Sequence, residues 1–310
     1  MPWQSKLDSA PGALGGQDRE GKAGRAARAA GGPAESTASK MTKTYLGRHV
    51  YGAAAITFGV ISLVWHDFGA PWQQTQALGK VPHREILVAL AAAVEVLGGI
   101  AIQWRRTVRI GALALVGVFL VFALLWVPRI LAEPLVYDRY GNLFEQLSIV
   151  SGALIVYAAE SGSDSEPAAG LARMGYIVFG ICVISFMLVH VFYMSSVAKF
   201  VPRWIPPGQR FWAFATTAAF ALAAIALLTG RSALLAARLL TAMIIGFGLL
   251  IWLPAPFADP HKLTNWAGNA QNLAIAGSAW IVADFLSRNR SARKAEMNSA
   301  QPILSHSSLD

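Results

Sequence analysis

Long apolar runs separated by short polar segments dominate the pattern of this chain. A helix needs about 20 apolar residues to cross the roughly 30 Å apolar core of a bilayer. Runs of about that length cover approximately residues 48–66, 85–104, 108–128, 143–160, 173–196, 211–230, 233–253 and 271–287. The pattern therefore predicts an all-α membrane protein with eight transmembrane helices.

The composition agrees with a protein whose main partner is the lipid bilayer. Only 14% of the residues are charged, 55% are hydrophobic, and the mean hydropathy is +0.46. Soluble chains carry about 25% charged residues. The net charge is +9, and the basic residues lie mostly beside the apolar runs. This placement is typical of topology signals and not of a nucleic-acid-binding patch. We therefore expect no nucleic-acid partner.

Both ends of the chain depart from the apolar pattern. Residues 1–44 are rich in glycine, alanine and charge, so they cannot bury enough surface to fold and are predicted to be a disordered basic arm. Translation from Met41, just before the first apolar run, is an alternative to translation from Met1. Residues 288–310 are predicted to be a disordered cytoplasmic tail.

A nine-residue pattern occurs twice, as WVPRILAEP at 126–134 and as WLPAPFADP at 252–260. The two copies lie 126 positions apart. The same offset, applied without a gap to residues 84–158, aligns three further identical pairs outside the pattern: Arg84 with Arg210, Arg105 with Arg231, and Leu113 with Leu239. Within the pattern it aligns Trp126 with Trp252, Pro128 with Pro254, and Pro134 with Pro260. Apolar sequence does not readily produce matched Trp and Pro by chance. The chain is therefore predicted to be a duplicated four-helix unit, with repeats at 45–161 and 171–287.

A unit with an even number of helices returns to the side from which it started. Both units then have the same orientation, which makes a parallel repeat of two four-helix bundles. Each Trp-x-Pro element ends the third helix of its unit. Trp anchors at the headgroup level and Pro cannot continue a helix, so we interpret these elements as interface stop signals. A role in lining a ligand site is the alternative.

The placement of Lys and Arg predicts the orientation. Thirteen of these residues fall on the side of the two termini: Lys40, Lys43, Arg48, Arg105, Arg106, Arg109, Arg173, Arg231, Arg238, Arg288, Arg290, Arg293 and Lys294. Eight fall on the other side: Lys80, Arg84, Arg129, Arg139, Lys199, Arg203, Arg210 and Lys262. Cytoplasmic loops carry the excess of positive charge. We expect a multi-pass protein of the inner (cytoplasmic) membrane with both termini in the cytoplasm.

Two stretches resemble a known family. AVEVLGGIAI at 93–102 resembles the Glu-x-x-Gly-Gly stretch in the second helix of the DoxX family, and FVPRWIPPGQRFW at 200–212 resembles the Pro-rich loop before that helix. The resemblance implies a tandem DoxX-like protein. It further implies a redox-associated or quinone-linked accessory subunit, with a quinone as cofactor and an oxidoreductase or a second copy of the chain as partner.

Only the first unit carries the family residues Glu95, Gly98 and Gly99. The second unit has Ala221, Ala224 and Ile225 at the matching positions, so the resemblance implies an asymmetric pair of units. Glu95 lies near the middle of a predicted span, where a carboxylate is costly and faces the bundle interior by default. It either handles protons beside a quinone or serves as a protonated hydrogen-bonding group that holds helices together.

Other candidate site residues lie at the predicted outer ends of the spans. His66 and His190 occupy roughly equivalent points of the two units and are candidates for proton relay or haem ligation; an interfacial position without ligand is the alternative. Trp126, Glu133, Trp252 and Asp259 are candidate ligand-binding residues around an outer vestibule. No metal site is predicted.

The sequence offers no enzyme signature. It has one cysteine, Cys182, and no Cys-x-x-Cys, phosphate-binding loop or dinucleotide fingerprint, so activity as a stand-alone enzyme is not expected. Two alternatives stand beside the redox-associated subunit. One is a small-molecule or ion transporter, although charged residues in the middle of the predicted spans, which a transport path would need, are scarce. The other is a structural or assembly protein without a ligand.

Overall fold

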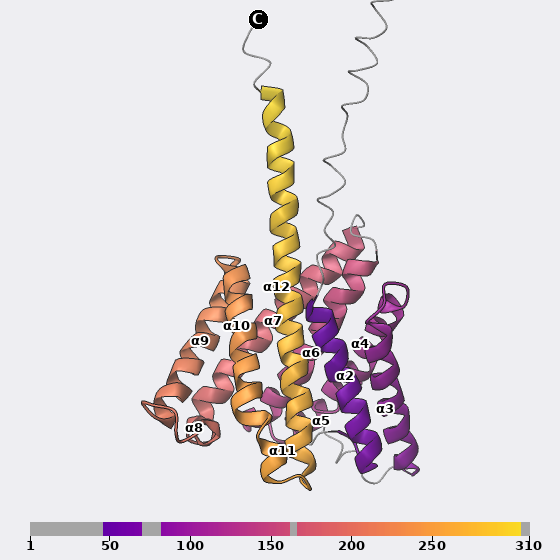
Figure 1. Cartoon of the computed structure of the whole chain (residues 1–310), viewed down its shortest axis with the longest axis vertical. Helices are drawn as coiled ribbons and strands as arrows, with labels where there is room; N and C mark the ends of the chain where they lie inside the picture. Colours follow the sequence, from indigo (N-terminus) through magenta and orange to yellow (C-terminus); the bar gives the residue numbers. More distant parts are fainter. Residues whose placement is uncertain (1–45, 70–81, 162–165, 305–310) are drawn as a thin grey trace, which may run out of the picture. The chain divides into compact units, whose positions relative to one another are not determined.

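The computed structural model describes residues 46–69, 82–161 and 166–304 (Figure 1). Within these ranges the chain is helical and has no β-strand. The long helices are α2 (Leu46–Trp65), α3 (Arg84–Ala101), α4 (Val108–Leu124), α6 (Tyr137–Glu160), α7 (Glu166–Phe192), α9 (Gln209–Thr229), α10 (Ala233–Phe247) and α12 (Leu263–Leu304). The predicted arm at 1–44 lies outside the described residues.

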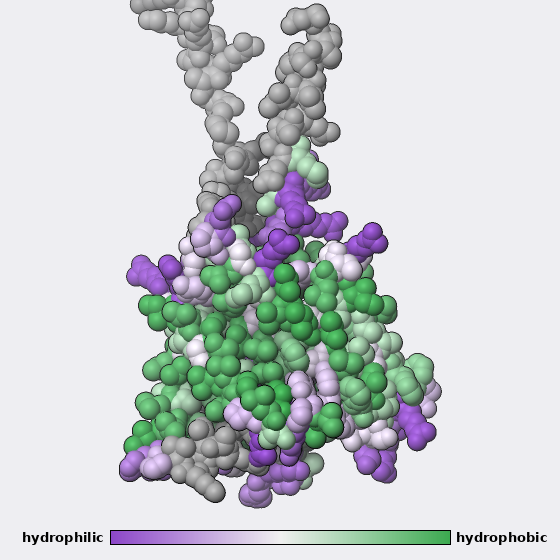
Figure 2. Space-filling model, turned by 180° about the vertical axis from the view of Figure 1, so that it is seen from behind, coloured by the Kyte–Doolittle hydropathy of each residue, from purple (hydrophilic) through white to green (hydrophobic). Residues whose placement is uncertain are grey.

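Six helical segments are long and apolar enough to cross a membrane. They are Leu46–Trp65, Val108–Ala132, Tyr137–Glu160, Glu166–Phe192, Gln209–Thr229 and Ala233–Ala258. The 18 residues of α3 carry Arg84, Glu85 and Glu95, and α12 begins with a polar stretch, so these two helices fall outside that set. Figure 2 shows apolar side chains over the middle of one face of the folded unit, with hydrophilic residues toward both ends.

Short helices gather at one end of the bundle (Figure 1). They are α5 (Val127–Ala132), α8 (Met194–Phe200), the π-helix η3 (Gly248–Trp252) and α11 (Ala255–Ala258), and we call this the short-helix end. The opposite end holds the start of α2 and the turns after α3, α6 and α9. We call it the arginine end, after Arg48, Arg105, Arg231 and Arg288.

Both Trp-x-Pro elements lie where a long helix gives way to a short one. After α4 ends at Leu124, α5 begins with Pro in its first turn. After α10, the π-helix leads into α11, which also has Pro in its first turn. Pro lacks the N–H that a helix interior needs but fits the first turn. The elements therefore act as helix stops, and their anchoring in a headgroup layer stays a prediction.

The two halves of the chain interlock. Within each half, helices pack in chain order: α2 on α3, α3 on α4 and α4 on α6, then α7 on α9, α9 on α10 and α10 on α12. Between the halves, α2 packs against α12, α6 packs against α7, and α6 contacts α12. The first helix of each half thus lies on the last helix of the other.

Small residues make these contacts between the halves close. A Cβ atom on Gly277 of α12 would lie 2.8 Å from the Tyr51 Cα of α2. One on Gly152 of α6 would lie 2.5 Å from the Ser278 Oγ of α12. In lipid, van der Waals packing replaces the hydrophobic effect between helices, and small residues let backbones approach. The glycines therefore set how closely the halves meet.

Hydrogen bonds at the short-helix end recur at an offset of 126 residues. The Tyr140 hydroxyl donates to the Pro134 carbonyl oxygen at 3.2 Å. The Trp266 indole N–H donates to the Pro260 carbonyl oxygen at 2.9 Å. The backbone turns just before these bonds match as well, since the N–H of Glu133 and of Asp259 each donate to the carbonyl four residues earlier.

The C-terminal region differs from the prediction of a disordered tail at 288–310. Instead, α12 continues as helix through Leu304, and residues 305–310 lie outside the described ranges. The stretch from 288 to 301 contains no Gly or Pro and is rich in Ala, Arg, Lys and other good helix formers. Because the bundle already nucleates α12, each further residue extends the helix without a new nucleation cost.

Candidate functional site

Glu95 of α3 is buried in the first half, with 1% of its surface exposed. The expectation that it faces the bundle interior is therefore confirmed. Its carboxylate acts electrostatically on the hydroxyl of Tyr51, which belongs to α2. That hydroxyl donates a hydrogen bond of 3.0 Å to the Ile149 carbonyl oxygen of α6. Three helices thus meet around a buried carboxyl group and a buried phenol.

The two glycines that follow Glu95 explain how α3 approaches its neighbours. A Cβ on Gly99 would lie 2.6 Å from the Gly52 carbonyl oxygen of α2. A Cβ on Gly98 would lie 2.9 Å from the Leu115 Cγ of α4. One glycine therefore faces each neighbour, and the pair holds Glu95 within a tightly closed three-helix contact.

This arrangement suits a group that binds or releases a proton. An ionised carboxylate away from water is costly unless a partner compensates it. The Tyr51 hydroxyl is a further polar group near this carboxyl group. The second half has Ala221 where the first has Glu95, so one such site exists among the described residues. Its role in proton handling stays a prediction.

A chain of polar side chains crosses the contact between α6 and α12. The Gln271 Nε2 of α12 donates to the Glu145 Oε2 of α6 at 3.3 Å, and the Gln146 Nε2 donates to the Gln271 Oε1 at 3.4 Å. Gln146 is fully buried, and its Oε1 has no hydrogen-bond donor among the described residues. Glu145 and Gln271 lie 126 positions apart, as do Gly152 and Ser278, which touch further along the same contact.

Amides on α12 also donate to backbone carbonyl groups of α10 and of the π-helix η3. The Trp252 carbonyl would normally accept from the residue four positions on, but that residue is Pro256, which has no N–H. The Asn269 side chain donates to it instead, at 2.6 Å. The Asn272 side chain donates to the Ile244 carbonyl oxygen at 2.9 Å. These amides have structural roles.

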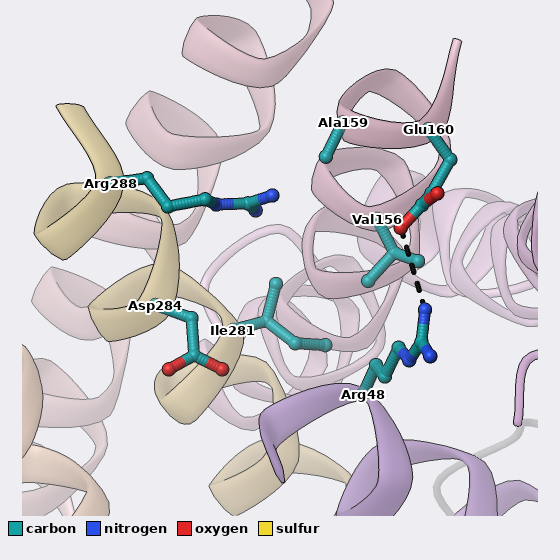
Figure 3. Close-up of a pocket in the computed structure, with 7 residues that line it drawn as sticks. All are labelled: Arg48, Val156, Ala159, Glu160, Ile281, Asp284 and Arg288. Carbon is teal, nitrogen blue, oxygen red and sulfur yellow. Dashed lines mark hydrogen bonds and ion pairs between the residues drawn. The ribbon is translucent and has the colours of Figure 1, made fainter. Parts of the chain in front are cut away.

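A small pocket lies at the arginine end between α2, α6 and α12 (Figure 3). Its volume is about 20 Å³, room for roughly one water. The Arg48 guanidinium points toward the Glu160 carboxylate, 3.4 Å away. Asp284 accepts the Gly47 N–H at 3.3 Å, and Arg288 reaches across from α12. Charges that balance within so small a space are best explained as ties between helix ends.

The two candidate histidines occupy different surroundings. His66 follows α2, is exposed, and has a positive φ of 50°. His190 of α7 contacts α9, where Thr216 and Thr217 lie within hydrogen-bond distance of its Nδ1 and the Phe220 ring is 5.1 Å away. The two imidazoles thus have different neighbours, and their role in proton relay or haem ligation stays a prediction. Among the residues described, no group of three His, Cys, Asp or Glu side chains is arranged to hold a metal.

The four candidate vestibule residues make local contacts in their own halves. Trp126 is 4% exposed, and Trp252 packs against Gly268. Glu133 pairs with Arg139 at 2.8 Å. The side chain of Asp259 is exposed, and its carbonyl oxygen accepts from Asn265. The structure does not bring these residues together with Glu95, and their ligand-binding role stays a prediction.

Sequence reasoning missed Tyr51, Gln146 and Gln271. The offset of 126 was the signal that points to Gln271, because it aligns this residue with Glu145. Polar residues at matched positions of two predicted spans meet if the two spans pack against each other across a twofold axis. The partner of Tyr51 is not visible in the sequence, because 98 positions separate it from Ile149.

No family model, curated protein or solved structure matches this chain. The functional proposal therefore rests on the residues of the chain itself.

Proposed function

We propose that the chain spans the membrane eight times, as two tandem four-helix units of the same orientation. The recurrence of hydrogen bonds at an offset of 126 supports the duplication. So does the contact of equivalent positions, Glu145 with Gln271 and Gly152 with Ser278, because two helices related by a twofold axis meet at equivalent residues. In this arrangement α3 and α12 also cross the membrane, and Glu95 lies inside the bundle, away from lipid.

The proposed topology predicts the sidedness of single cysteines. Cys182 is buried, so its replacement by serine gives a background without a native thiol. Cysteines placed at Arg105 and Arg231 should react with an impermeant maleimide from the cytoplasmic side alone. Cysteines at Glu133 and Asp259 should react from the opposite side alone. Labelling of Arg105 and Arg231 positions from opposite sides would rule out a parallel repeat.

For the activity, we propose a proton-handling membrane subunit that works beside a quinone or a partner oxidoreductase, in the manner that the DoxX resemblance implies. The observation that carries this proposal is the 1% exposed Glu95 carboxyl group beside the Tyr51 hydroxyl. A buried carboxyl group can hold a proton where water is absent, and buried ionisable groups in spans are functional by default.

A structural role for Glu95 is the competing proposal. The tight contacts of Gly98 with α4 and of Gly99 with α2 favour this role, because a protonated carboxyl group also serves as a hydrogen-bonding tie between packed helices. The transporter alternative has no specific observation in its favour among the described residues.

Glu95→Gln separates the two roles, because it keeps the shape and hydrogen bonds of a protonated carboxyl group but cannot exchange a proton. We expect the variant to keep the melting temperature of the wild type within about 2 °C, and to lose function in a growth assay under oxidative or sulfur stress. Quinone that co-purifies from native membranes should be measured by mass spectrometry for both proteins.

Glu85→Gln is the matched control, because it removes a carboxylate whose side chain is 75% exposed on the same helix. It should leave both stability and growth unchanged. Full growth with Glu95→Gln would favour the structural role. A Glu95→Leu variant as stable and active as the wild type would refute both roles.

A further inference from the structure

We propose that Glu145, Gln146 and Gln271 form a binding site for one monovalent cation at the contact between α6 and α12. The ligand is a single positive charge, either a proton or Na⁺, held by carboxylate and amide oxygens. The site lies between the two halves of the chain and does not depend on the role of Glu95.

The direction of the hydrogen bonds leaves one oxygen without a donor. An ionised carboxylate only accepts, so Gln271 must present its Nε2 to Glu145. The Gln271 Oε1 then accepts from the Gln146 Nε2. This leaves the Gln146 Oε1 as the orphan acceptor, on a side chain that is 0% exposed. Turning either amide over would set two acceptors against each other, so local rearrangement does not satisfy it.

A cation changes this arrangement in either of two forms. A protonated Glu145 would donate to the Gln271 Oε1, and the Gln271 Nε2 would then donate to the Gln146 Oε1. Both amides turn over in this form, so the Gln146 Oε1 gains a donor and its Nε2 takes the buried place that the oxygen held. A sodium ion would instead take oxygens of Glu145 and Gln146 as ligands, since hard cations prefer carboxylate and carbonyl oxygens. Both forms also neutralise the Glu145 charge.

The two existing hydrogen bonds, from Gln271 to Glu145 and from Gln146 to Gln271, are long. Their lengths of 3.3 and 3.4 Å lie beyond the usual range of about 2.7–3.2 Å for N–H···O bonds. Glu145 is partly exposed when the whole residue is considered. Gln146 next to it is fully buried, so the orphan oxygen has no contact with bulk water.

The charges around the site favour a positive ligand. Asp138, two turns earlier on α6, acts on Glu145 as a second negative charge. The neighbouring Arg139 is engaged by Glu133 and Asp138, at 2.8 and 3.2 Å. From the turn between α7 and α8, the Tyr193 hydroxyl accepts the Asp138 N–H.

The remaining neighbours add no cation to the site among the described residues. From α12 the site meets the amide of Gln271, while the next residue, Asn272, donates to the Ile244 carbonyl of α10. The charged residue of α4 is Arg109, which lies over the Tyr157 ring at 5.4 Å, about three turns of α6 away toward the arginine end. Positive charge must therefore come from a ligand.

Thermal unfolding of the purified full chain tests the site, since a ligand that binds only the folded state raises its stability by mass action. In one arm NaCl replaces choline chloride stepwise at constant ionic strength and fixed alkaline pH. In the other arm the pH is lowered stepwise without Na⁺. The variants are Glu145→Gln, Gln146→Met and the control Glu85→Gln. At saturation we expect a rise of roughly 5 °C in the melting temperature of the wild type and of the control.

Each outcome decides the proposal. A rise with Na⁺ that Glu145→Gln and Gln146→Met abolish supports a sodium site. A rise with acid alone that Glu145→Gln abolishes supports a proton site. A wild type that responds to neither ion, or a response that both variants retain, overturns the proposal. If one variant does not fold, the other variant and the wild type still decide the proposal. A wild type whose melting temperature is the same in sodium and in choline, and does not rise with acid, contradicts it without any variant.

Discussion

Replacement of Gly277 by valine is expected to lower the apparent melting temperature by about 10 °C, which corresponds to the upper end of the 1–3 kcal/mol typical of overpacking. The position leaves no space for a side chain, since an added Cβ would lie 2.8 Å from both the Cα and the N of Tyr51. These are backbone atoms and cannot move aside as a flexible side chain can. Helices α2 and α12 must therefore separate, and the contact between the halves opens.

Gly117→Val is the matched control for this substitution. Gly117 lies in α4, another apolar helix, and a Cβ there would meet nothing within 4 Å. We expect a change of about 2 °C or less, because the added side chain faces open space and valine is slightly the better helix former. Thermal unfolding of both variants in the same detergent measures the difference. Equal stability of the two variants would mean that α2 and α12 do not pack at Gly277.

Cutting the chain between Glu160 and Glu166 is expected to produce two halves that accumulate only when they are expressed together. Each half alone would lose three helix contacts at once: α2 with α12, α6 with α7, and α6 with α12. A loss of only 1.4 kcal/mol already changes an equilibrium about tenfold. We therefore expect at least a roughly tenfold drop in the membrane-inserted yield of either half expressed alone.

Co-purification measures the assembly directly. With an affinity tag on the first half alone, the second half should be recovered in a one-to-one ratio after detergent extraction. The cut chain with Gly277→Val serves as the internal control, because it weakens the same contact without altering either half's own helix pairs. Two halves that each accumulate and fold independently would contradict the interlocked arrangement.

The sequence by itself determined the helices and the internal offset. Each of the eight apolar runs became a long helix, and Pro128 and Pro254 each fall where a long helix ends. These are local properties, because the length of an apolar run and the missing N–H of proline act without reference to the rest of the fold. The burial of Glu95 was predictable for the same reason, since a carboxylate has no favourable position against lipid.

The tertiary structure alone decided which face of each helix is buried and which helices meet. Leu113 is 54% exposed and Leu115 is fully buried, although both are leucines of α4. Lipid is as apolar as the protein interior, so a helix that is apolar all round carries no periodic signal for its inner face. The pairing of α2 with α12 joins residues more than 120 positions apart. So do the hydrogen bonds from Gln271 to Glu145 and from Gln146 to Gln271. Among the described residues, close packing at glycines such as Gly152 and Gly277 acts together with these hydrogen bonds to select the partners.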